Sequence, residues 1–282
     1  MDNNVLNELR KLAAKIRIGV LEQIGTLGFG HIGGALSVVD TLAVLYGQVM
    51  RIDPKNPLWA ARDRFVCSKG HAGPAVYATL GLMGFFPYED IKTLNIPGTN
   101  FPSHCDHNKT PGVDITTGSL GQGASLAVGI ALGCQLKEVD SRVFLMLGDG
   151  ELNEGQVWEA AMFASSRKLS NLYVFIDNNK KQLDGYIKDI LDTGDIAAKF
   201  EAFGFDTQKV NGSDVAAISE AIEKAFSSHD KPHAIVLDTI KGAGVPDVEN
   251  TVANHSMNIT AEQAEIWIAA LRAEIEDIRG NL

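Results

Sequence analysis

The chain has 282 residues, of which 45% are hydrophobic and 21% charged, so it has the length of one large domain or two modest ones and the composition of a globular protein. Its formal net charge is −10 and no segment is rich in Lys and Arg, which argues against nucleic acid as a partner. The three cysteines form no CxxC pair, the N-terminus lacks an apolar signal core and no apolar run is long enough for a membrane span, so we expect a cytoplasmic protein without a membrane partner.

The first part of the chain is predicted to contain helices around one short strand. Hydrophobic residues at three- and four-residue steps over 6–20 are typical of an amphipathic helix. A second helix is predicted over 37–50. The apolar run 64–67 predicts a strand, which a Gly-His turn separates from a helix over 74–83.

The middle of the chain alternates between strand and helix patterns. A Gly-rich loop over 119–123 is followed in chain order by a helix over 124–137, a strand over 143–147, a helix over 154–168 and a strand over 172–176. The same scheme continues with a strand over 207–210, a helix over 213–227 and a strand over 234–238. These strands are apolar throughout rather than alternating, as in parallel sheets that helices cover on both faces. We therefore predict an α/β fold with a parallel sheet flanked by helices.

The C-terminal part is predicted to add no second core. The segment 242–258 is polar and is expected to be irregular. Thr260 and Gln263 have the spacing of a capping box, and apolar residues then recur at helical spacing, which predicts a helix over 260–279. We expect residues 1–282 to form a single domain.

Two polar segments follow neighbouring apolar strands of the predicted sheet. Asp149 lies between Gly148 and Gly150 at the end of one strand, and Asn179 follows the next strand along the chain. Because ligands of open parallel sheets sit beyond the carboxyl ends of the strands, both side chains are expected at one rim. A carboxylate and an amide oxygen suit Mg²⁺, and two protein side chains leave room for diphosphate oxygens, a backbone carbonyl and water.

This arrangement resembles the signature of thiamine-diphosphate enzymes, a Gly-Asp-Gly followed one helix and one strand later by a paired Asn. The resemblance implies that Asp149, Asn179 and the backbone carbonyl of Lys181 bind Mg²⁺. It also implies that the Gly150 N–H contacts the diphosphate and that Leu183 packs against the thiazolium ring. Thiamine diphosphate and Mg²⁺ are therefore the expected cofactors.

Histidines narrow the resemblance to one family. His31 lies in Gly-His-Ile-Gly-Gly, His71 in Ser-Lys-Gly-His-Ala-Gly and His104 in Phe-Pro-Ser-His. Together with Thr-Thr-Gly-Ser-Leu-Gly-Gln-Gly over 116–123, they resemble transketolase along nearly the whole chain. The similarity is closest to the N-terminal, diphosphate-binding subunits of split, two-subunit transketolases.

The transketolase resemblance implies further contacts with the cofactor. His71 and His255 would contact the diphosphate, whereas Gly118 and Leu120 would contact the aminopyrimidine. The cofactor would act as the electron sink while the protein supplies binding, orientation and electrostatics. The expected reaction is transfer of a two-carbon ketol unit from a ketose donor to an aldose acceptor.

Two other histidines are expected on the substrate side. By resemblance, His31 and His104 would line the substrate channel and hydrogen-bond the donor ketose, and as neutral imidazoles they could transfer protons. The chain differs from full-length transketolases in that Ile32 and Cys105 stand where Pro is usual, which affects the shape of the channel. Pentose phosphates, an apulose phosphate and a sulfonated fructose all stay open as substrates.

The resemblance also implies a partner chain. In the family, a Glu on a pyrimidine-binding domain activates the cofactor, and that domain follows the diphosphate-binding domain. Since the sequence ends at Leu282, we expect a separate C-terminal transketolase subunit to supply it, and an α₂β₂ complex is the simplest assembly. Glu154 would reach toward that catalytic Glu across the interface.

Two other functions stay open at this point. The alpha subunit of a 2-oxo acid dehydrogenase shares the Gly-Asp-Gly signature, but it is not expected to combine it with the histidines and the 116–123 loop. A non-catalytic regulatory paralogue is the second alternative, and the intact ligands at Asp149 and Asn179 argue against it.

Overall fold

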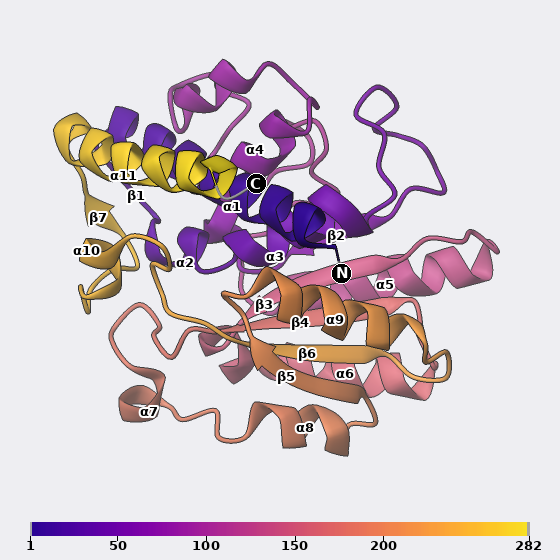
Figure 1. Ribbon diagram of the computed structural model, residues 1–282. Coiled ribbons are helices and arrows are strands. Elements are labelled where there is room, and N and C mark those ends of the chain that lie inside the picture. Colours follow the sequence, from indigo (N-terminus) through magenta and orange to yellow (C-terminus); the bar gives the residue numbers. More distant parts are fainter. Residues whose placement is uncertain (1, 281–282) are drawn as a thin grey trace.

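The computed structural model describes residues 2–280, and its centre is a five-stranded sheet with the order β2-β3-β4-β6-β5 (Figure 1). The strands are β2 (Arg64–Cys67), β3 (Val143–Gly148), β4 (Leu172–Asn178), β5 (Asp206–Asn211) and β6 (His233–Asp238). Every neighbouring pair in this sheet is parallel. The predicted α/β class with a parallel sheet is therefore confirmed.

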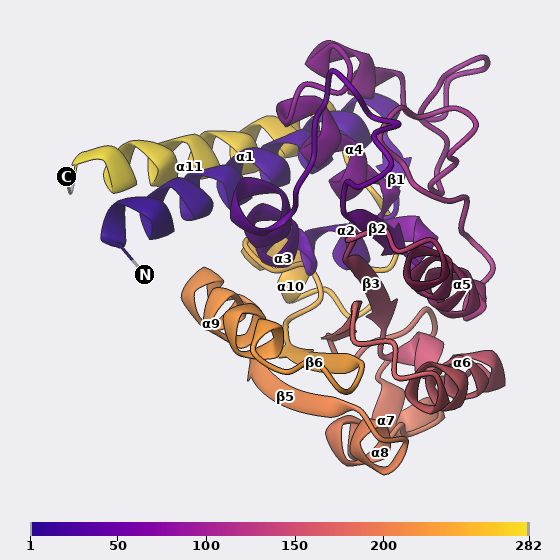
Figure 2. The ribbon, with the colours of Figure 1, turned by 90° about the vertical axis from the view of Figure 1, so that its right-hand side faces the viewer.

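Helices cover both faces of the sheet (Figure 2). One layer contains α1 (Asn3–Leu27), α2 (Gly33–Leu36), α3 (Val39–Val44), α4 (Gly73–Leu82), α9 (Val215–Phe226) and α11 (Ala261–Gly280), and the other contains α5 (Gln122–Leu136), α6 (Gly155–Ser166) and α8 (Ile196–Ala202). Helix α11 lies alongside α1 (Figure 1). No helix between residues 2 and 280 combines the length and hydrophobicity that crossing a bilayer requires.

The alternation of side chains explains why the strands are apolar throughout. In β3, Phe144 and Met146 pack with the layer that contains α1, whereas Leu145 and Leu147 pack with α5 and α6. Successive side chains point to opposite faces of a strand, so a sheet covered on both faces needs apolar residues at every position. The same arrangement recurs in β4 and β6.

Elements outside the sheet differ in part from the predictions. The helix predicted over 37–50 consists of α3 followed by a π-helical turn, η1 (Leu45–Val49). The segment 242–258 was predicted to be irregular, but it contains α10 (Pro246–Glu249) and β7 (Met257–Asn258). Strand β7 pairs antiparallel with β1 (Phe29–Gly30). This pairing joins the residues just before His31 to the residues just after His255.

The predicted capping box at the start of α11 is confirmed. The Thr260 backbone N–H donates to Gln263 Oε1 at 3.0 Å, and the Gln263 N–H donates to Thr260 Oγ1 at 3.1 Å. Each of these bonds satisfies a backbone donor that the first turn of a helix leaves unpaired. The reciprocal pair therefore sets the start of the last helix.

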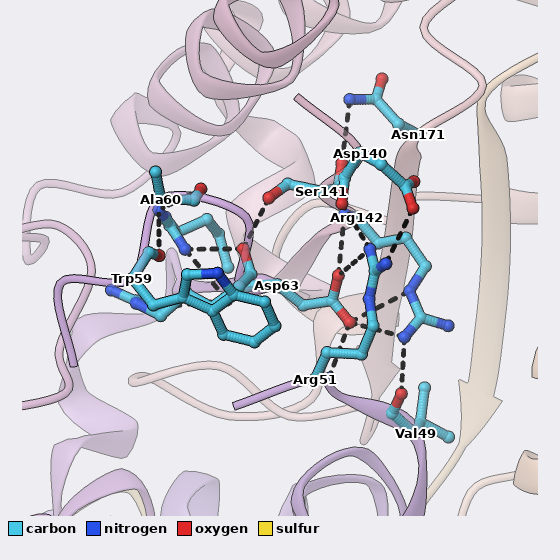
Figure 3. Close-up of polar contacts among 11 residues, drawn as sticks. Val49, Arg51, Trp59, Ala60, Asp63, Asp140, Ser141, Arg142 and Asn171 are labelled. Carbon is cyan, nitrogen blue, oxygen red and sulfur yellow. Dashed lines mark hydrogen bonds and ion pairs between the residues drawn. The ribbon is translucent and has the colours of Figure 1, made fainter. Parts of the chain in front are cut away.

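A polar network ties the amino ends of the strands together (Figure 3). The fully buried carboxylate of Asp63 accepts hydrogen bonds from the backbone N–H groups of Arg51 and Arg142, both at 2.9 Å, and from the Arg142 guanidinium at 2.6 and 3.0 Å. Arg51 also contacts Asp140. The network fixes β2 beside β3, in the register that pairs Arg64 with Val143. In this register the last residue of β2, Cys67, lies beside Met146, and β3 continues to Gly148 at the opposite edge.

Candidate functional site

The two side chains predicted as metal ligands lie at the carboxyl edge of the sheet. Asp149 directly follows β3 and Asn179 directly follows β4, and the two strands pair with Gly148 opposite Asp177. The Asp149 N–H donates to the Asp177 carbonyl oxygen at 3.1 Å, and the Lys180 N–H donates to Asp149 Oδ2 at 2.5 Å. The two turns are therefore bonded to each other at one rim, where the strand pattern places them.

Three kinds of oxygen meet at this rim. Asp149 Oδ1 accepts a hydrogen bond from Gly150 N at 2.9 Å, and Asn179 Oδ1 accepts one from Lys181 N at 3.1 Å. The Lys181 carbonyl oxygen accepts one from the Lys241 ammonium, also at 3.1 Å. A carboxylate, an amide oxygen and a backbone carbonyl are hard ligands of the kind that Mg²⁺ takes. One of the three already contacts a cationic group.

The electrostatics of Asp149 favour a cation beside it. Burial raises the pKa of Asp149 to about 7, and the negative charge of Asp177 adds to this effect. A cation beside a buried carboxylate stabilises its ionised form. Within residues 2–280, no group of three or more His, Cys, Asp or Glu could hold a metal. The three oxygens at the rim fit Mg²⁺ that takes its remaining ligands from a bound molecule and water.

A pocket of about 490 Å³ opens at this rim. It is lined by every residue to which the sequence assigns a role, namely His31, His71, His104, Gly118, Leu120, Asp149, Gly150, Glu154, Asn179, Lys181, Leu183 and His255. These residues come from loops that are far apart in the sequence and that all lie at the carboxyl edge of the sheet. The structure brings the whole predicted set together, and the role of each residue stays a prediction.

Four histidines cluster on one side of the pocket. The ring centroids of His71 and His255 are 4.7 Å apart, and His31 lies 5.3 Å from both His104 and His255. Burial is the main cause that lowers the pKa of each ring, and it lowers the pKa of His255 to about 3. The rings are therefore neutral near pH 7, when each has one nitrogen that donates and one that accepts.

The tautomer of His255 follows from its neighbour. Lys241 Nζ lies 3.3 Å from His255 Nδ1. A protonated lysine can only donate, so Nδ1 is the acceptor of this contact and Nε2 carries the hydrogen. His255 therefore has an N–H donor available for an anionic ligand.

Two glycines let the backbone approach the histidines. A Cβ on Gly34 would lie 2.9 Å from His71 Nε2, which is closer than side-chain atoms normally come. Gly118 has a φ of 150°, and a Cβ there would lie 3.5 Å from the His104 ring. Side chains at these positions would displace the rings or strain the loop. The glycines therefore allow the backbone to pass close to the rings of His71 and His104.

Further charged residues of the site are not singled out by sequence reasoning. Lys69 and Lys241 line the pocket, and burial lowers the pKa of Lys241 to about 8. Glu151 accepts hydrogen bonds from Gly121 N at 2.8 Å and Gly148 N at 3.0 Å, and it also contacts Ser68 Oγ. Lys241 follows β6, so the rule that places ligands at strand ends could have found it. The partners of Lys69 and Glu151 depend on the folded topology.

The mouth of the pocket is apolar and exposed. Leu120 is 39% exposed and Leu183 is 64% exposed, and Ile190 and Leu191 beside them are exposed as well. Glu154 is exposed at the same mouth, directly before α6. Exposed apolar side chains gathered around a binding site commonly mark a contact surface.

Comparisons with known proteins agree on one family. A family model described as "Transketolase, thiamine diphosphate binding domain" matches residues 9–274. The chain is 49% identical over 269 residues to the 6-deoxy-6-sulfo-D-fructose transketolase subunit SqwG of Clostridium sp. (strain MSTE9), a match that covers 95% of this chain and 96% of the relative. It is 36% identical over 270 residues to an apulose-4-phosphate transketolase subunit of Actinobacillus succinogenes, and that match covers 95% of this chain and 97% of the relative.

The fold of the chain also matches solved structures. The transketolase of Pichia stipitis in complex with sedoheptulose 7-phosphate superposes with a TM-score of 0.85 at 29% sequence identity. The match covers 97% of this chain and 45% of the Pichia chain. The present chain therefore spans less than half the length of that solved protein, and nearly the full length of the relatives that are named as subunits.

Proposed function

The chain belongs to the transketolase family, and we infer from this premise that it is the thiamine-diphosphate-binding subunit of a two-chain transketolase. It transfers a two-carbon ketol unit from a ketose donor to an aldose acceptor. The observation that carries this conclusion is the pocket that collects the predicted residues at the carboxyl edge of the sheet. The match over residues 9–274 and the subunit relatives support it, and they do not favour the 2-oxo acid dehydrogenase alternative.

Residues at the carboxyl edge of the sheet are proposed to bind the diphosphate of the cofactor. Asp149, Asn179 and the Lys181 carbonyl would hold Mg²⁺, with the remaining positions left for diphosphate oxygens and water. The Gly150 N–H, His71 and His255 would donate to the diphosphate. Thiamine diphosphate, when bound, supplies the electron sink for breaking the bond between the second and third carbons of the ketose.

Other residues of the pocket surround the rest of the cofactor and the sugar. Gly118 and Leu120 would contact the aminopyrimidine, and Leu183 would pack against the thiazolium. His31 and His104 would hold the donor hydroxyls. Because burial lowers the pKa of both histidines, each is neutral near pH 7 and can accept a proton or donate one to an oxygen atom.

A partner chain would complete the pyrimidine end of the site. We propose a C-terminal transketolase subunit that carries the pyrimidine-binding domain and its catalytic Glu, with Glu154 facing that residue in an α₂β₂ assembly. The exposed Leu120 and Leu183 at the mouth support a contact there. On α5, a Cβ added to Gly129 or Gly133 would meet no atom within 4 Å, so packing inside this chain does not account for these two glycines. They fit close approach by the partner.

The donor is proposed to be a ketose with an anionic end. The two subunit relatives are named for 6-deoxy-6-sulfo-D-fructose and apulose 4-phosphate, which carry a sulfonate and a phosphate respectively. Pentose phosphates belong to the same class. We also propose that residues 1–282 act as one domain in the cytoplasm, where the free thiols of Cys67, Cys105 and Cys134 stay reduced.

A donor panel tests the proposed reaction. The complex of this chain with its partner would receive xylulose 5-phosphate, apulose 4-phosphate or 6-deoxy-6-sulfo-D-fructose, together with an aldose acceptor, thiamine diphosphate and Mg²⁺. Release of a carbonyl product two carbons shorter than the donor (an aldose from the unbranched ketoses, dihydroxyacetone phosphate from apulose 4-phosphate), with a ketose two carbons longer than the acceptor, supports ketol transfer. Release of CO₂ from a 2-oxo acid, with no transfer from any ketose, would support the dehydrogenase alternative instead.

A further inference from the structure

One buried carboxylate lies beside the proposed metal site and is not among its proposed ligands. Asp177 lies near the end of β4, its side chain is fully buried, and it does not line the pocket. It accepts hydrogen bonds from Ser37 Oγ at 2.6 Å and from Asn179 Nδ2 at 2.8 Å. It also accepts one from the Lys69 ammonium and one from Thr239 Oγ1.

The four donors are distributed unequally over the two oxygens of this carboxylate. Ser37 Oγ, Asn179 Nδ2 and the Lys69 ammonium all donate to Oδ2, whereas Thr239 Oγ1 donates to Oδ1. The buried Lys69 ammonium, 1% exposed, balances its charge. Three donors therefore surround Oδ2, and the side chain does not line the pocket, although the residue lies two positions before Asn179. In this arrangement the second carboxylate at the rim serves as a hydrogen-bond acceptor for its neighbours.

The contact with Asn179 determines which way its amide points. Asp177 can only accept, so the Asn179 NH₂ group must face it. The Lys181 backbone N–H can only donate, so the amide oxygen must face Lys181 at 3.1 Å. Both contacts require the same orientation, in which the NH₂ group faces Asp177 and Oδ1 faces Lys181.

We propose that Asp177 is a positioning residue for the metal site. It holds the Asn179 amide so that Oδ1, and not the NH₂ group, faces Mg²⁺, while Lys69 keeps the carboxylate neutralised. This inference rests on the metal site of the proposed function. Hydrogen-bond partners of metal ligands typically change metal affinity by about 10- to 100-fold when they are removed.

The first test is the Mg²⁺ concentration that half-saturates binding of thiamine diphosphate, measured by calorimetry on the complex with the partner. Asp177→Ala removes the acceptor for the Asn179 NH₂ group and is expected to raise this concentration about 10- to 100-fold. Asp177→Asn keeps an acceptor oxygen for that group, because its own NH₂ can donate to Thr239 Oγ1, and it should stay within a few-fold of the wild type. Ser37→Ala deletes a different donor to the same carboxylate and is the matched control, with no expected change.

A rescue variant separates positioning from general structural support. An Asp at 179 presents oxygen in either orientation, so Asp177→Ala/Asn179→Asp should recover most of the lost Mg²⁺ affinity. If Asp177→Ala folds and its half-saturating Mg²⁺ concentration equals that of the wild type, the proposal is wrong. If Asp177→Ala does not fold, the double variant is measured instead. A folded double variant that still needs a much higher half-saturating Mg²⁺ concentration than the wild type overturns the proposal. A double variant that also fails to fold overturns it as well, because the role of Asp177 is then structural.

Asp149→Ala distinguishes a failure of the proposed metal site from a failure of the positioning role of Asp177. If the wild type binds thiamine diphosphate without Mg²⁺, or if Asp149→Ala leaves the Mg²⁺ dependence unchanged, the proposed metal site itself fails. If both behave as expected and only the Asp177 variants do not, the metal site stands and the positioning role alone is rejected.

Discussion

The Lys241 ammonium donates a hydrogen bond of 3.1 Å to the carbonyl oxygen of Lys181, the backbone oxygen proposed as a metal ligand. The same ammonium lies 3.3 Å from His255 Nδ1, on a residue proposed to bind the diphosphate. One buried cationic group therefore connects the metal end of the pocket to its phosphate end. A carbonyl oxygen has two lone pairs, so Lys181 can serve the lysine and a metal ion together.

Removal of this charge should weaken cofactor binding. Lys241→Met should raise the Kd for thiamine diphosphate about 10- to 100-fold, because a hydrogen bond to a charged group contributes about 1.5–3 kcal/mol. Lys241→Arg keeps the charge and should lose less affinity. Calorimetric titration of both variants in the complex measures the difference, and an unchanged Kd for Lys241→Met would show that the ammonium has only a structural role.

Loss of the Asp149 carboxylate should weaken cofactor binding more than loss of the Lys241 ammonium. Asp149→Ala removes the one charged ligand of the proposed site, so binding of thiamine diphosphate that depends on Mg²⁺ should be abolished. The fold should survive, because Asp149 lies at the rim of the sheet rather than in its apolar core. Circular dichroism checks the fold, and wild-type affinity for thiamine diphosphate in the presence of the partner would contradict the assignment.

The two substrate-side histidines should behave differently from the metal ligand. His31→Ala and His104→Ala are expected to bind thiamine diphosphate nearly as the wild type does and to lose ketose turnover. The reason is their place in the pocket, since neither ring is proposed to contact the diphosphate. Calorimetry and a steady-state assay at saturating cofactor measure the two effects, and a variant that loses cofactor affinity but keeps turnover has been assigned the wrong role.

His233 should make the fold less stable in acid. Its ring opens β6, is 1% exposed and stacks on Tyr173 with centroids 4.9 Å apart, and in the described part of the chain neither ring nitrogen makes a hydrogen bond. Burial lowers the pKa of His233, and the nearby Asp206 carboxylate only partly opposes this. The native state therefore keeps the ring neutral, while the unfolded chain takes up a proton below about pH 6.5. Stability should fall as the pH drops below that value.

His233→Phe tests this account. The substitution keeps an aromatic ring against Tyr173 and removes two buried polar nitrogens, so it should stabilise the protein by about 1 kcal/mol at pH 7.5. The gain should increase at pH 5.5, because the variant has no imidazole to protonate. Urea unfolding of both proteins at the two pH values measures it, and a gain that does not depend on pH would contradict the predicted titration.

Much of the sheet could be predicted because its strands are short, continuous apolar runs. The predicted strand 64–67 has the same bounds as β2, and 143–147 differs from β3 by one residue. Helix α8 was not predicted, since only Ile196 and Phe200 anchor it in the core. The pairing of β1 with β7 was also missed, because a two-residue strand leaves no periodic pattern.

Some residues of the candidate site could be predicted from the sequence and others could not. Asp149 and His71 could be singled out because each lies next to a glycine, in a turn that follows a predicted strand. Lys69 and Asp177 could not be paired from the sequence, since they are 108 residues apart and meet only after β2 and β4 are placed on either side of β3. The order of the strands in the sheet determines which charged residues meet, and a single sequence does not show that order directly.

We expect this chain to react only together with a second chain, because its pocket holds the diphosphate end of the cofactor while the partner supplies the pyrimidine end. Cofactor that binds only the complex should also stabilise it, so thiamine diphosphate should raise the melting temperature of the mixture more than that of either chain alone. The mixture itself is expected to be a stable complex with a large interface.

The most direct measurement is turnover of the best donor ketose with an aldose acceptor, thiamine diphosphate and Mg²⁺, by this chain alone, by the partner alone and by the two chains mixed. We expect ketol transfer by the mixture and none by either chain alone. If the mixture forms a complex but does not use that donor, the choice of donor is wrong while the division between two chains stands. Sustained turnover by the isolated 282-residue chain would show that no second chain is needed.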